Sequence, residues 1–242
     1  MIFLYFDIHS HILPCVDDGA TDIDNAVQLL ETAKENGISH ILATPHFYPS
    51  EDSLEAFLSR TKSAYNELKA KIGERDLPEI YLGSEILYFI GMGTAENLFA
   101  LTLNGSKYIL LELVGSDINK FLFKDLLELK KRGYTPIIAH FERYTKLKGF
   151  KKLFSFVKAN GIIVQINTIA LTVPLYVRFL KKVLNNNIFC VLATDAHSLD
   201  RRPPILNSVL DIIKQKLGNK YHDRLIENSQ KLFKRITGED IE

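Results

Sequence analysis

Short apolar runs alternate along this chain with longer stretches of mixed polarity. The apolar runs cover residues 2–6, 38–43, 80–82, 108–111, 136–139, 162–166 and 188–193. Most of them are rich in isoleucine, valine, leucine or aromatic residues, which is typical of strands buried on both faces of a parallel sheet. We therefore expect seven short, buried strands.

The stretches between these runs space their apolar residues with the period of a helix. They predict helices from residue 24 to Gly37 and over residues 53–72, 121–131, 150–159 and 175–184. Strand–helix alternation of this kind predicts an α/β fold, either a barrel or a doubly wound sheet. Because neither an internal repeat nor a linker rich in Pro, Gly or Ser divides the chain, we expect a single domain over residues 1–242.

Polar side chains follow every predicted strand. In parallel α/β folds, catalytic residues collect just beyond the carboxyl ends of the strands. Five of the seven histidines lie at such ends. In chain order the residues there are His9, His11, His46, Glu85, Glu112, His140, Asn167, Asp195 and His197. A lone histidine at one strand end is more often a packing residue, but the repetition along the chain predicts a site.

The residue types in this set predict a metal centre. His9 and His11 are two residues apart in an extended segment, so both imidazoles face the same side, and Asp195 and His197 repeat that spacing. With Asp18 from the next turn, five histidines, two aspartates and two glutamates are candidate ligands. Since one ion takes about four to six ligands, this number indicates two or three ions. Nitrogen and oxygen donors without thiolates favour Mn, Zn or Fe and predict metal-assisted hydrolysis.

Two arginines indicate the class of substrate. Arg143 lies three residues after His140, and Arg202 lies five residues after His197. A guanidinium group at the rim of a metal site matches a phosphate group with two parallel N–H donors. Either arginine alone could equally be part of a surface salt bridge, but two arginines that directly follow two metal motifs favour phosphate-ester hydrolysis.

Composition, charge and residue spacing argue against several other classes of protein. Lys and Arg number 30 against 29 Asp and Glu, and this near-neutral balance argues against nucleic acid or an acidic membrane as the main partner. The two cysteines cannot form a disulfide framework, so we expect a cytoplasmic protein. The chain predicts neither a signal peptide nor an integral membrane segment. A cysteine-dependent phosphatase is also excluded, because Thr21 and Ala196 stand where an arginine would follow Cys15 or Cys190 by six residues.

An ordered set of motifs spans nearly the whole chain: residues 7–14 (DIHSHILP), 17–20 (DDGA), 43–46 (ATPH), 83–86 (GSEI), 111–112, 139–144, 165–167, 194–197 and 202–204. This set resembles the PHP (polymerase and histidinol phosphatase) superfamily. More narrowly, it resembles the bacterial protein-tyrosine phosphatases of the CpsB/YwqE type, which are tied to capsule and exopolysaccharide production. The resemblance implies a distorted (β/α)7, TIM-like barrel.

The same resemblance implies a role for each matched residue. The metal ligands would be His9, His11, Asp18, His46, Glu85, Glu112, His140, Asp195 and His197. They would hold two or three divalent ions, usually manganese, with iron or zinc as alternatives. A metal-activated hydroxide would attack phosphorus while Arg143 and Arg202 hold the phosphoryl oxygens, and Asp18 would be catalytic as well as a ligand. The implied substrate is a phosphotyrosine protein, the tail of a cognate bacterial tyrosine kinase.

Some positions leave the substrate and its docking open. Cys15 stands where the family usually has glycine, and Phe141 replaces the usual proline after His140. Three aromatic residues, Phe47, Tyr48 and Tyr88, are candidates for the rim of the site or for ordinary packing. The lysines at 146, 148, 151 and 152 could dock an acidic tail or could be a solvated helix start. Three alternatives remain: a PHP-type phosphatase of small molecules such as histidinol phosphate, a nuclease and a non-catalytic regulatory protein. The sequence does not predict the oligomeric state.

Overall fold

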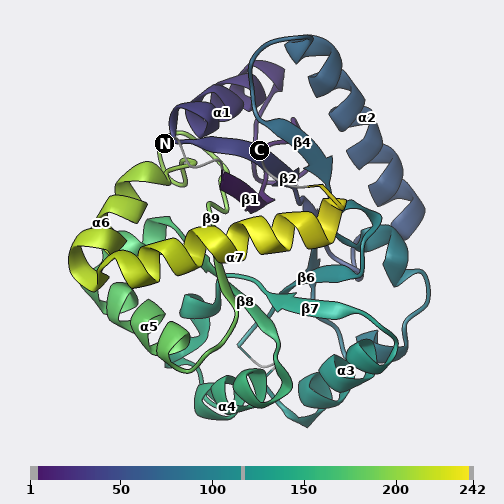
Figure 1. The fold of residues 1–242 in the computed structure, drawn as a ribbon. Coiled ribbons are helices and arrows are strands. Elements are labelled where there is room, and N and C mark those ends of the chain that lie inside the picture. The colour runs from purple at the N-terminus through teal and green to yellow at the C-terminus, as the bar shows by residue number, and fades with distance from the viewer. Residues whose placement is uncertain (1–4, 116–117, 240–242) are drawn as a thin grey trace.

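The computed structural model describes residues 5–115 and 118–239, and all of its named strands pair in parallel (Figure 1). The strands are β1 (Tyr5–Ser10), β2 (Ile38–Ala43), β3 (His46–Phe47), β4 (Glu79–Leu82), β5 (Glu85–Leu87), β6 (Tyr108–Glu112), β7 (Thr135–Ile138), β8 (Ile163–Asn167) and β9 (Cys190–Ala193). Residues 2–4 of the first predicted strand lie outside the described residues.

Two interruptions divide these strands into two sheets. One sheet holds β1, β2 and β4, and the other holds β3, β5, β6, β7, β8 and β9 in that order. β3 follows β2 after residues 44–45, and β5 follows β4 after residues 83–84. The N–H of Glu85 donates to the carbonyl of Pro45 at 3.1 Å, so the two interrupted strands stay side by side across the gap.

The end of β9 returns to β1. The N–H of Asp195 donates to the carbonyl of His9, and the N–H of His11 donates to the carbonyl of Ala196, both at 2.8 Å. The buried carboxylate of Asp7 accepts hydrogen bonds from the N–H and the hydroxyl of Thr194 at 3.1 and 2.5 Å. If each interrupted pair counts as one strand, seven strand units follow one another around a distorted barrel. The predicted α/β fold is confirmed.

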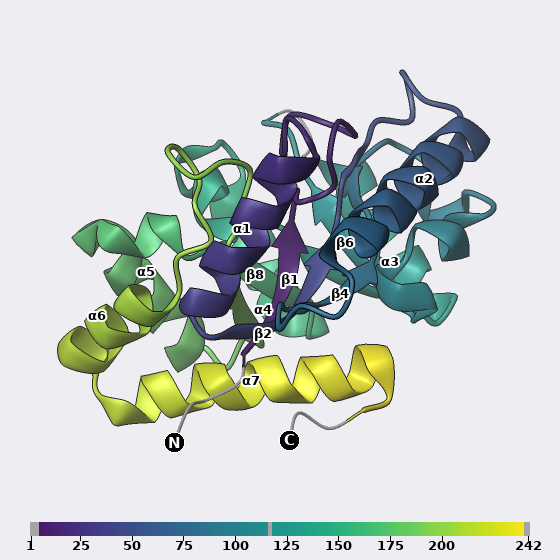
Figure 2. The same ribbon diagram turned by 90° about the horizontal axis from the view of Figure 1, so that it is seen from above.

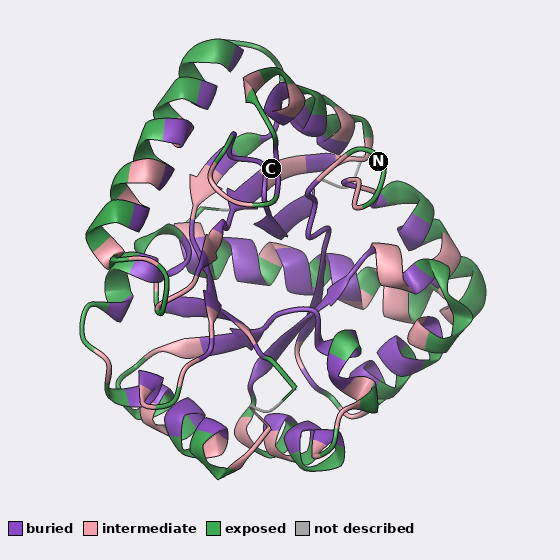
Figure 3. Ribbon diagram, turned by 180° about the vertical axis from the view of Figure 1, so that it is seen from behind, coloured by how far each residue is buried: buried purple, intermediate pink, exposed green. Residues whose placement is uncertain are grey.

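Helices surround this barrel and bury one face each against it (Figure 3). They are α1 (Ile23–Glu35), α2 (Leu54–Ile72), α3 (Lys120–Lys131), α4 (Phe150–Asn160), α5 (Pro174–Asn185), α6 (Asn207–Leu217) and α7 (Asn219–Thr237). Local signals fix several ends: the Asp22 carboxylate accepts from the N–H of Asn25, and the Ser53 hydroxyl accepts from the N–H of Ala56. Both residue types are preferred N-caps. None of the described helices is long and apolar enough to cross a membrane.

Helix α7 closes one end of the barrel, and the loop after β1 lies at the opposite end (Figure 2). Leu232 and Phe233 of α7 are fully buried and belong to the core cluster that also contains Phe6 and Ile8 of β1. The Phe233 ring meets the Phe6 ring at 5.0 Å in an edge-on arrangement. With the amino ends of the strands covered, the carboxyl ends, where the polar motifs lie, form the accessible end of the barrel.

The predicted helices agree with the structure to within one or two residues, but the prediction missed two α-helices and two short strands. α6 and α7 were not predicted, nor were the two-residue β3 and the three-residue β5. His46 and Glu85 were expected just beyond strands; they instead open β3 and β5, directly after each interruption. The short strands escaped prediction because two or three residues carry no periodicity.

Candidate active site

The first two histidines converge at the carboxyl end of β1, as their spacing predicts. The Nε2 atoms of His9 and His11 lie 3.2 Å apart, and both side chains are buried. Glu85 Oε2 lies 3.2 Å from the first of these atoms and 3.3 Å from the second. Three of the nine predicted ligands thus present their donor atoms to one point inside the barrel.

The structure arranges the candidate ligands in three overlapping groups whose donor atoms lie within 4.8 Å of one another. The groups are His11, Asp18, His46 and His197; His9, His11 and Asp195; and His46, Glu85 and Glu112. His11 and His46 each belong to two groups, so they lie where neighbouring ion positions would meet. Overlapping groups of this kind are what a cluster of two or three ions needs.

His140 stands outside these three groups but still reaches the carboxylates. Its Nε2 atom lies 2.9 Å from Glu85 Oε1 and 3.4 Å from Glu112 Oε1. Asp18 is the most exposed of the nine, with 63% of its side chain accessible, and it reaches His197 Nε2 at 3.2 Å from the mouth of the site. All nine predicted residues are therefore brought together at one end of the barrel.

Several buried donor atoms fit a cation rather than a hydrogen-bond network. His46 Nδ1, Glu85 Oε2 and His197 Nε2 are buried and have no hydrogen-bond partner of suitable geometry within the described residues. Although His46 Nδ1 lies 3.0 Å from Glu85 Oε2, their orientations do not make a hydrogen bond. Buried polar groups are rarely left unpaired, and groups of these types find their partner in a divalent ion. The residues present thus fit the predicted metals.

Most of the histidines are oriented by a partner on the ring nitrogen that faces away from the cluster. His11 Nδ1 donates to Asp17 Oδ2 at 2.6 Å, and His197 Nδ1 donates to the backbone carbonyl of Asp195 at 2.8 Å. His9 Nδ1 lies 3.2 Å from Gln165 Oε1, and His140 Nδ1 lies 3.0 Å from the hydroxyl of Tyr144. A partner on Nδ1 leaves Nε2 free to ligate, which is how metal-binding histidines are usually held.

Charge in the cluster shifts the pKa values of its members. Burial alone lowers the pKa of His11, but the carboxylates of Asp17 and Glu85 outweigh burial and raise it to about 10. Burial, helped by the neighbouring charge of His11, lowers the pKa of His197 to about 4. Two imidazoles in one site therefore favour opposite protonation states, which is characteristic of functional sites.

Both predicted arginines meet at the same carboxylate. Arg143 Nη2 donates to Asp195 Oδ2 at 2.5 Å, and Arg202 Nη1 lies 3.3 Å from both oxygens of Asp195. Arg202 Nη2 also reaches Asp18 Oδ2 at 3.3 Å. Both arginines keep part of their side chains accessible, 41% for Arg143 and 28% for Arg202. Two guanidinium groups thus border the acidic cluster on its open side.

Two of the candidate ligands have a strained backbone. His140 and Asp195 have φ values of 32° and 53°, a left-handed region that favours glycine. Such conformations cost about 1–3 kcal/mol each and persist where the surroundings impose them, above all at functional sites. Each of these residues comes two positions after the end of its strand, His140 after β7 and Asp195 after β9. The left-handed conformation redirects the chain so that the side chain points into the cluster.

Residues 5–234 match the family described as "Capsular polysaccharide synthesis, CpsB/CapC". The chain belongs to the CpsB/CapC family. The resemblance stated from the motifs is therefore confirmed, and the match covers all nine candidate ligands and both arginines.

Named relatives of the CpsB/CapC chain match it over almost its full length. The tyrosine-protein phosphatase CpsB of Streptococcus pneumoniae is 31% identical over 243 residues, which cover 94% of this chain and 97% of the relative. The tyrosine-protein phosphatase YwqE of Bacillus subtilis is 28% identical over 244 residues, covering 96% and 92%.

Solved structures give the same result at the level of the fold. A chain from the crystal structures of YwqE from B. subtilis and CpsB from S. pneumoniae, described as metal-dependent tyrosine phosphatases, aligns with a TM-score of 0.81 and 26% identity over 96% of this chain and 95% of that chain. A phosphotriesterase homology protein from Escherichia coli aligns with a TM-score of 0.53 at 12% identity, over 94% and 98%. The second likeness shows a shared fold alone.

Sequence reasoning missed the residues that support the candidate ligands of this CpsB/CapC chain. Asp17 accepts hydrogen bonds from His11, from the N–H of His46 at 3.0 Å and from the N–H of Gly19 at 3.0 Å. Gln165 Oε1 accepts from the N–H of His140 at 2.6 Å as well as from His9. Both residues lie inside motifs quoted for the resemblance, so the motif match was the signal that could have found them.

The structure also separates the aromatic candidates into residues of the core and a residue at the border of the site. Phe47 and Tyr88 are buried, and the Tyr88 hydroxyl donates to Asp125 at 2.8 Å, so both belong to the packed core. Tyr48 remains partly exposed and stacks on His46, with ring centroids 5.0 Å apart and an angle of 19° between the rings. Tyr48 is therefore the one of the three that borders the site.

The two departures from the family pattern lie at structurally defined positions. Cys15 is exposed and adopts φ 58°, the conformation for which glycine is the usual residue. Phe141 is fully buried and meets Phe150 at 5.3 Å and Phe179 at 5.9 Å. The phenyl ring thus anchors the 3-10 helix η4 (Phe141–Lys146), which carries Arg143, to helices α4 and α5.

Proposed function

We propose that this protein is a metal-dependent phosphatase that hydrolyses phosphotyrosine on proteins. The observation that carries the proposal is the meeting of Arg143 and Arg202 at Asp195, at the open side of a cluster of nine metal-type ligands. A phosphate monoester needs both parts: cationic donors for its oxygens and a means of activating water. The CpsB and YwqE relatives are tyrosine-protein phosphatases, which supports the same activity here.

In this proposal the three groups of histidines and carboxylates hold two or three divalent ions. Bound there, the ions would supply Lewis acidity, which lowers the pKa of water and offsets negative charge on phosphoryl oxygens. Manganese is the metal we propose, with iron or zinc as alternatives, because the donors are imidazole and carboxylate groups without thiolates. Asp17, Gln165 and Tyr144 would hold the histidine rings in the ligating orientation.

The two arginines bind and orient the phosphoryl group. Each guanidinium group presents parallel N–H donors that match phosphoryl oxygens. Both guanidinium groups already donate to Asp195 before a substrate binds. Preorganised donors of this kind stabilise charge as it develops, because they need no rearrangement during the reaction. Asp18 lies beside Arg202 at the mouth, where it can both ligate and steer the guanidinium group.

The leaving group and its ring fit the rest of the site. A phenol has a pKa of about 10, far below that of an aliphatic alcohol, so a phenolate departs more readily. Tyr48 borders the site with its ring stacked on His46. We propose that the face of Tyr48 contacts the substrate ring, since aromatic pairs of this kind contribute about 0.5–1.5 kcal/mol beyond burial.

The proposed partner is the tail of a cognate bacterial tyrosine kinase that regulates capsule or exopolysaccharide synthesis. The family description, capsular polysaccharide synthesis, supports that setting. We propose a cytoplasmic location, since Cys15 is exposed and Cys190 buried, and neither forms a disulfide.

A substrate panel tests the proposal. Purified protein loaded with manganese is assayed side by side on phosphotyrosine peptides, phosphoserine peptides and histidinol phosphate. We expect the highest kcat/KM on phosphotyrosine, with activity lost after chelation and recovered on adding the metal. Faster hydrolysis of histidinol phosphate would instead identify a small-molecule phosphatase, and metal-loaded protein without activity on any ester would identify a non-catalytic regulatory protein.

A further inference from the structure

Four lysines lie immediately downstream of Arg143. Lys146 ends the 3-10 helix η4 that contains Arg143, Lys148 follows it, and Lys151 and Lys152 lie in the first turn of α4. All four side chains are exposed. We call them the lysine patch.

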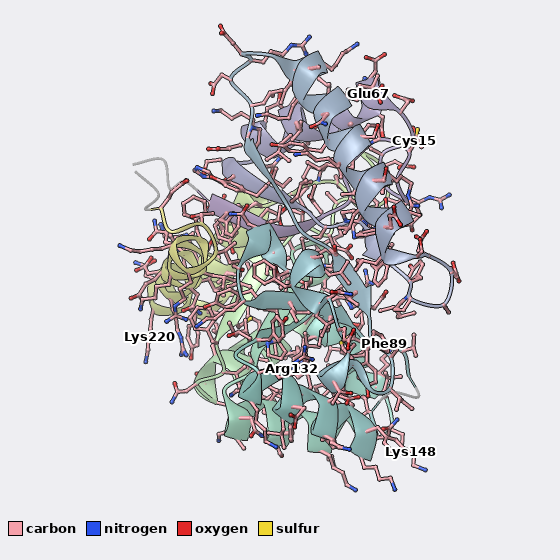
Figure 4. All side chains as sticks on the ribbon, turned by 90° about the vertical axis from the view of Figure 1, so that its right-hand side faces the viewer. Cys15, Glu67, Phe89, Arg132, Lys148 and Lys220 are labelled. Atoms are coloured by element: carbon pink, nitrogen blue, oxygen red, sulfur yellow. The ribbon has the colours of Figure 1, made fainter. Side chains whose placement is uncertain are left out.

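The lysine patch lies at the same end of the barrel as the candidate active site. η4 and the start of α4 follow the carboxyl end of β7, from which His140 reaches the cluster. Figure 4 shows Lys148 on the side where Cys15 lies, in the loop that also carries Asp18, while Lys220 of α7 lies on the opposite side. A polypeptide bound at the site can therefore extend over the lysine patch.

The charge of the patch is not matched by the protein itself. No described carboxylate lies within 4.0 Å of any of the four ammonium groups, whereas exposed Lys34, Lys71 and Lys231 each pair with an aspartate or a glutamate. Lys151 and Lys152 also lie at the helix end where cations oppose the helix dipole. Neither ion pairing nor helix stability accounts for lysines at these positions.

Two lysines of the patch, Lys151 and Lys152, border a hollow with an apolar part. A depression of about 390 Å³ is lined by Thr145, Leu147, Gly149, Phe150, Lys151 and Lys152. Its walls combine an aliphatic and an aromatic side chain with two ammonium groups. This combination suits a peptide segment in which acidic residues flank a small apolar one.

We propose that the lysine patch docks acidic residues close to the phosphotyrosine of the protein substrate. This inference rests on the proposed function and adds a sequence preference to it. A 3-10 helix rises about 2 Å per residue, so Lys146 lies roughly 6 Å from Arg143 along the chain, with the remaining lysines further out. Because an extended peptide advances about 3.3 Å per residue, the patch meets acidic side chains roughly two to five positions from the phosphotyrosine.

The test compares two phosphotyrosine peptides that differ only in their flanks. One carries Glu and Asp two to five positions on both sides of the phosphotyrosine, and the other carries Gln and Asn there. We expect the manganese-loaded protein to prefer the acidic peptide by about tenfold in kcat/KM, as several exposed charge pairs would give. The preference should shrink between 50 and 500 mM salt, because added salt screens exposed charges.

Matched variants locate the preference. The patch variant is Lys148→Gln, Lys151→Gln and Lys152→Gln; Lys146 is kept because it shares η4 with Arg143. The control variant is Lys214→Gln, Lys216→Gln and Lys220→Gln, which removes the same charge from exposed positions on α6 and α7. We expect the ratio of kcat/KM on the acidic peptide to kcat/KM on the neutral peptide to fall to nearly one in the patch variant. In the control variant this ratio should stay as high as in the unaltered protein.

Each other outcome overturns a defined statement. Equal kcat/KM of the unaltered protein on the two peptides would overturn the docking proposal and leave the proposed function intact. An equal loss of preference in both variants would overturn it too, because overall charge would then be the cause. If the unaltered protein hydrolysed neither phosphotyrosine peptide, the proposed function would fail, and the docking proposal with it.

Discussion

Replacing Asp17 by asparagine should weaken metal binding without removing a ligand. The Asp17 carboxylate accepts three hydrogen bonds: from His11 Nδ1 at 2.6 Å, from the N–H of His46 at 3.0 Å and from the N–H of Gly19 at 3.0 Å. An asparagine side chain presents only one oxygen. In either orientation, its NH2 group therefore faces at least one of these donors.

The hydrogen bonds set the size of the effect. A hydrogen bond to a charged group contributes about 1.5–3 kcal/mol, and Asp17→Asn loses at least one such bond together with the charge that favours His11 as a donor from Nδ1. Loss of an outer partner of a metal-binding histidine typically lowers metal affinity about 10–100-fold, which corresponds to about 1.4–2.7 kcal/mol. The two free-energy ranges agree. We therefore expect the manganese concentration for half-maximal binding to rise about 10–100-fold.

Isothermal titration with manganese measures the affinity, and phosphatase activity against manganese concentration gives a second reading. At saturating manganese, activity should return to within a few-fold of the original. The matched control is Asp22→Asn, since Asp22 caps α1 and asparagine caps a helix equally well. An unchanged manganese affinity of Asp17→Asn would refute the reasoning. If Asp17→Asn lost activity although its metal sites were fully occupied, Asp17 would take part in the reaction itself.

Three further predictions concern the arginines, the rim and the fold. Arg143→Ala or Arg202→Ala should lower kcat/KM for phosphotyrosine peptides about 100-fold or more while elemental analysis shows retained metal; unaltered kinetics would remove that arginine from the site. Tyr48→Ala should raise KM for phosphotyrosine peptides about two- to tenfold with a smaller change in kcat, and Tyr48→Phe, which keeps the ring, should not. Phe233→Ala should lower the urea-measured stability by about 3–5 kcal/mol, whereas exposed Phe99→Ala should change it by less than about 0.5 kcal/mol.

The elements that the sequence predicted well carry their signals locally. The helix expected over residues 53–72 is α2, Leu54–Ile72, because Ser53 caps its start and Gly73 ends it. α7 was missed although Leu225, Leu232, Phe233 and Ile236 repeat at a helical spacing. Its role could not be derived from that spacing, since the surface that it covers is formed by strands far away in the chain.

The candidate ligands were predictable because their residue types are rare and recur at strand ends. Residue type could not separate Asp17 from Asp18, which are adjacent in one turn. Only the folded chain places Asp17 against His11 and leaves Asp18 at the mouth beside Arg202. Likewise, no sequence pattern shows that His140 and Asp195 adopt left-handed backbone conformations, because the surrounding structure imposes them.

The charge of the site makes the ions necessary for binding as well as for reaction. Without metal, two arginines and two histidines, His11 and His140, face five carboxylates: Asp17, Asp18, Glu85, Glu112 and Asp195. Neighbouring carboxylates outweigh burial and raise the pKa of His11 to about 10 and that of His140 to about 9, so −5 and +4 give −1. A phosphotyrosine carries about −1.5 to −2 at neutral pH and is not attracted to a site of this charge. Ions that displace the histidine protons would face −3, so two divalent ions would bring the sum to +1 and three to +3. Chelation should therefore abolish binding of inorganic phosphate, measured by calorimetry, while circular dichroism shows a retained fold; equal binding without metal would contradict this charge argument.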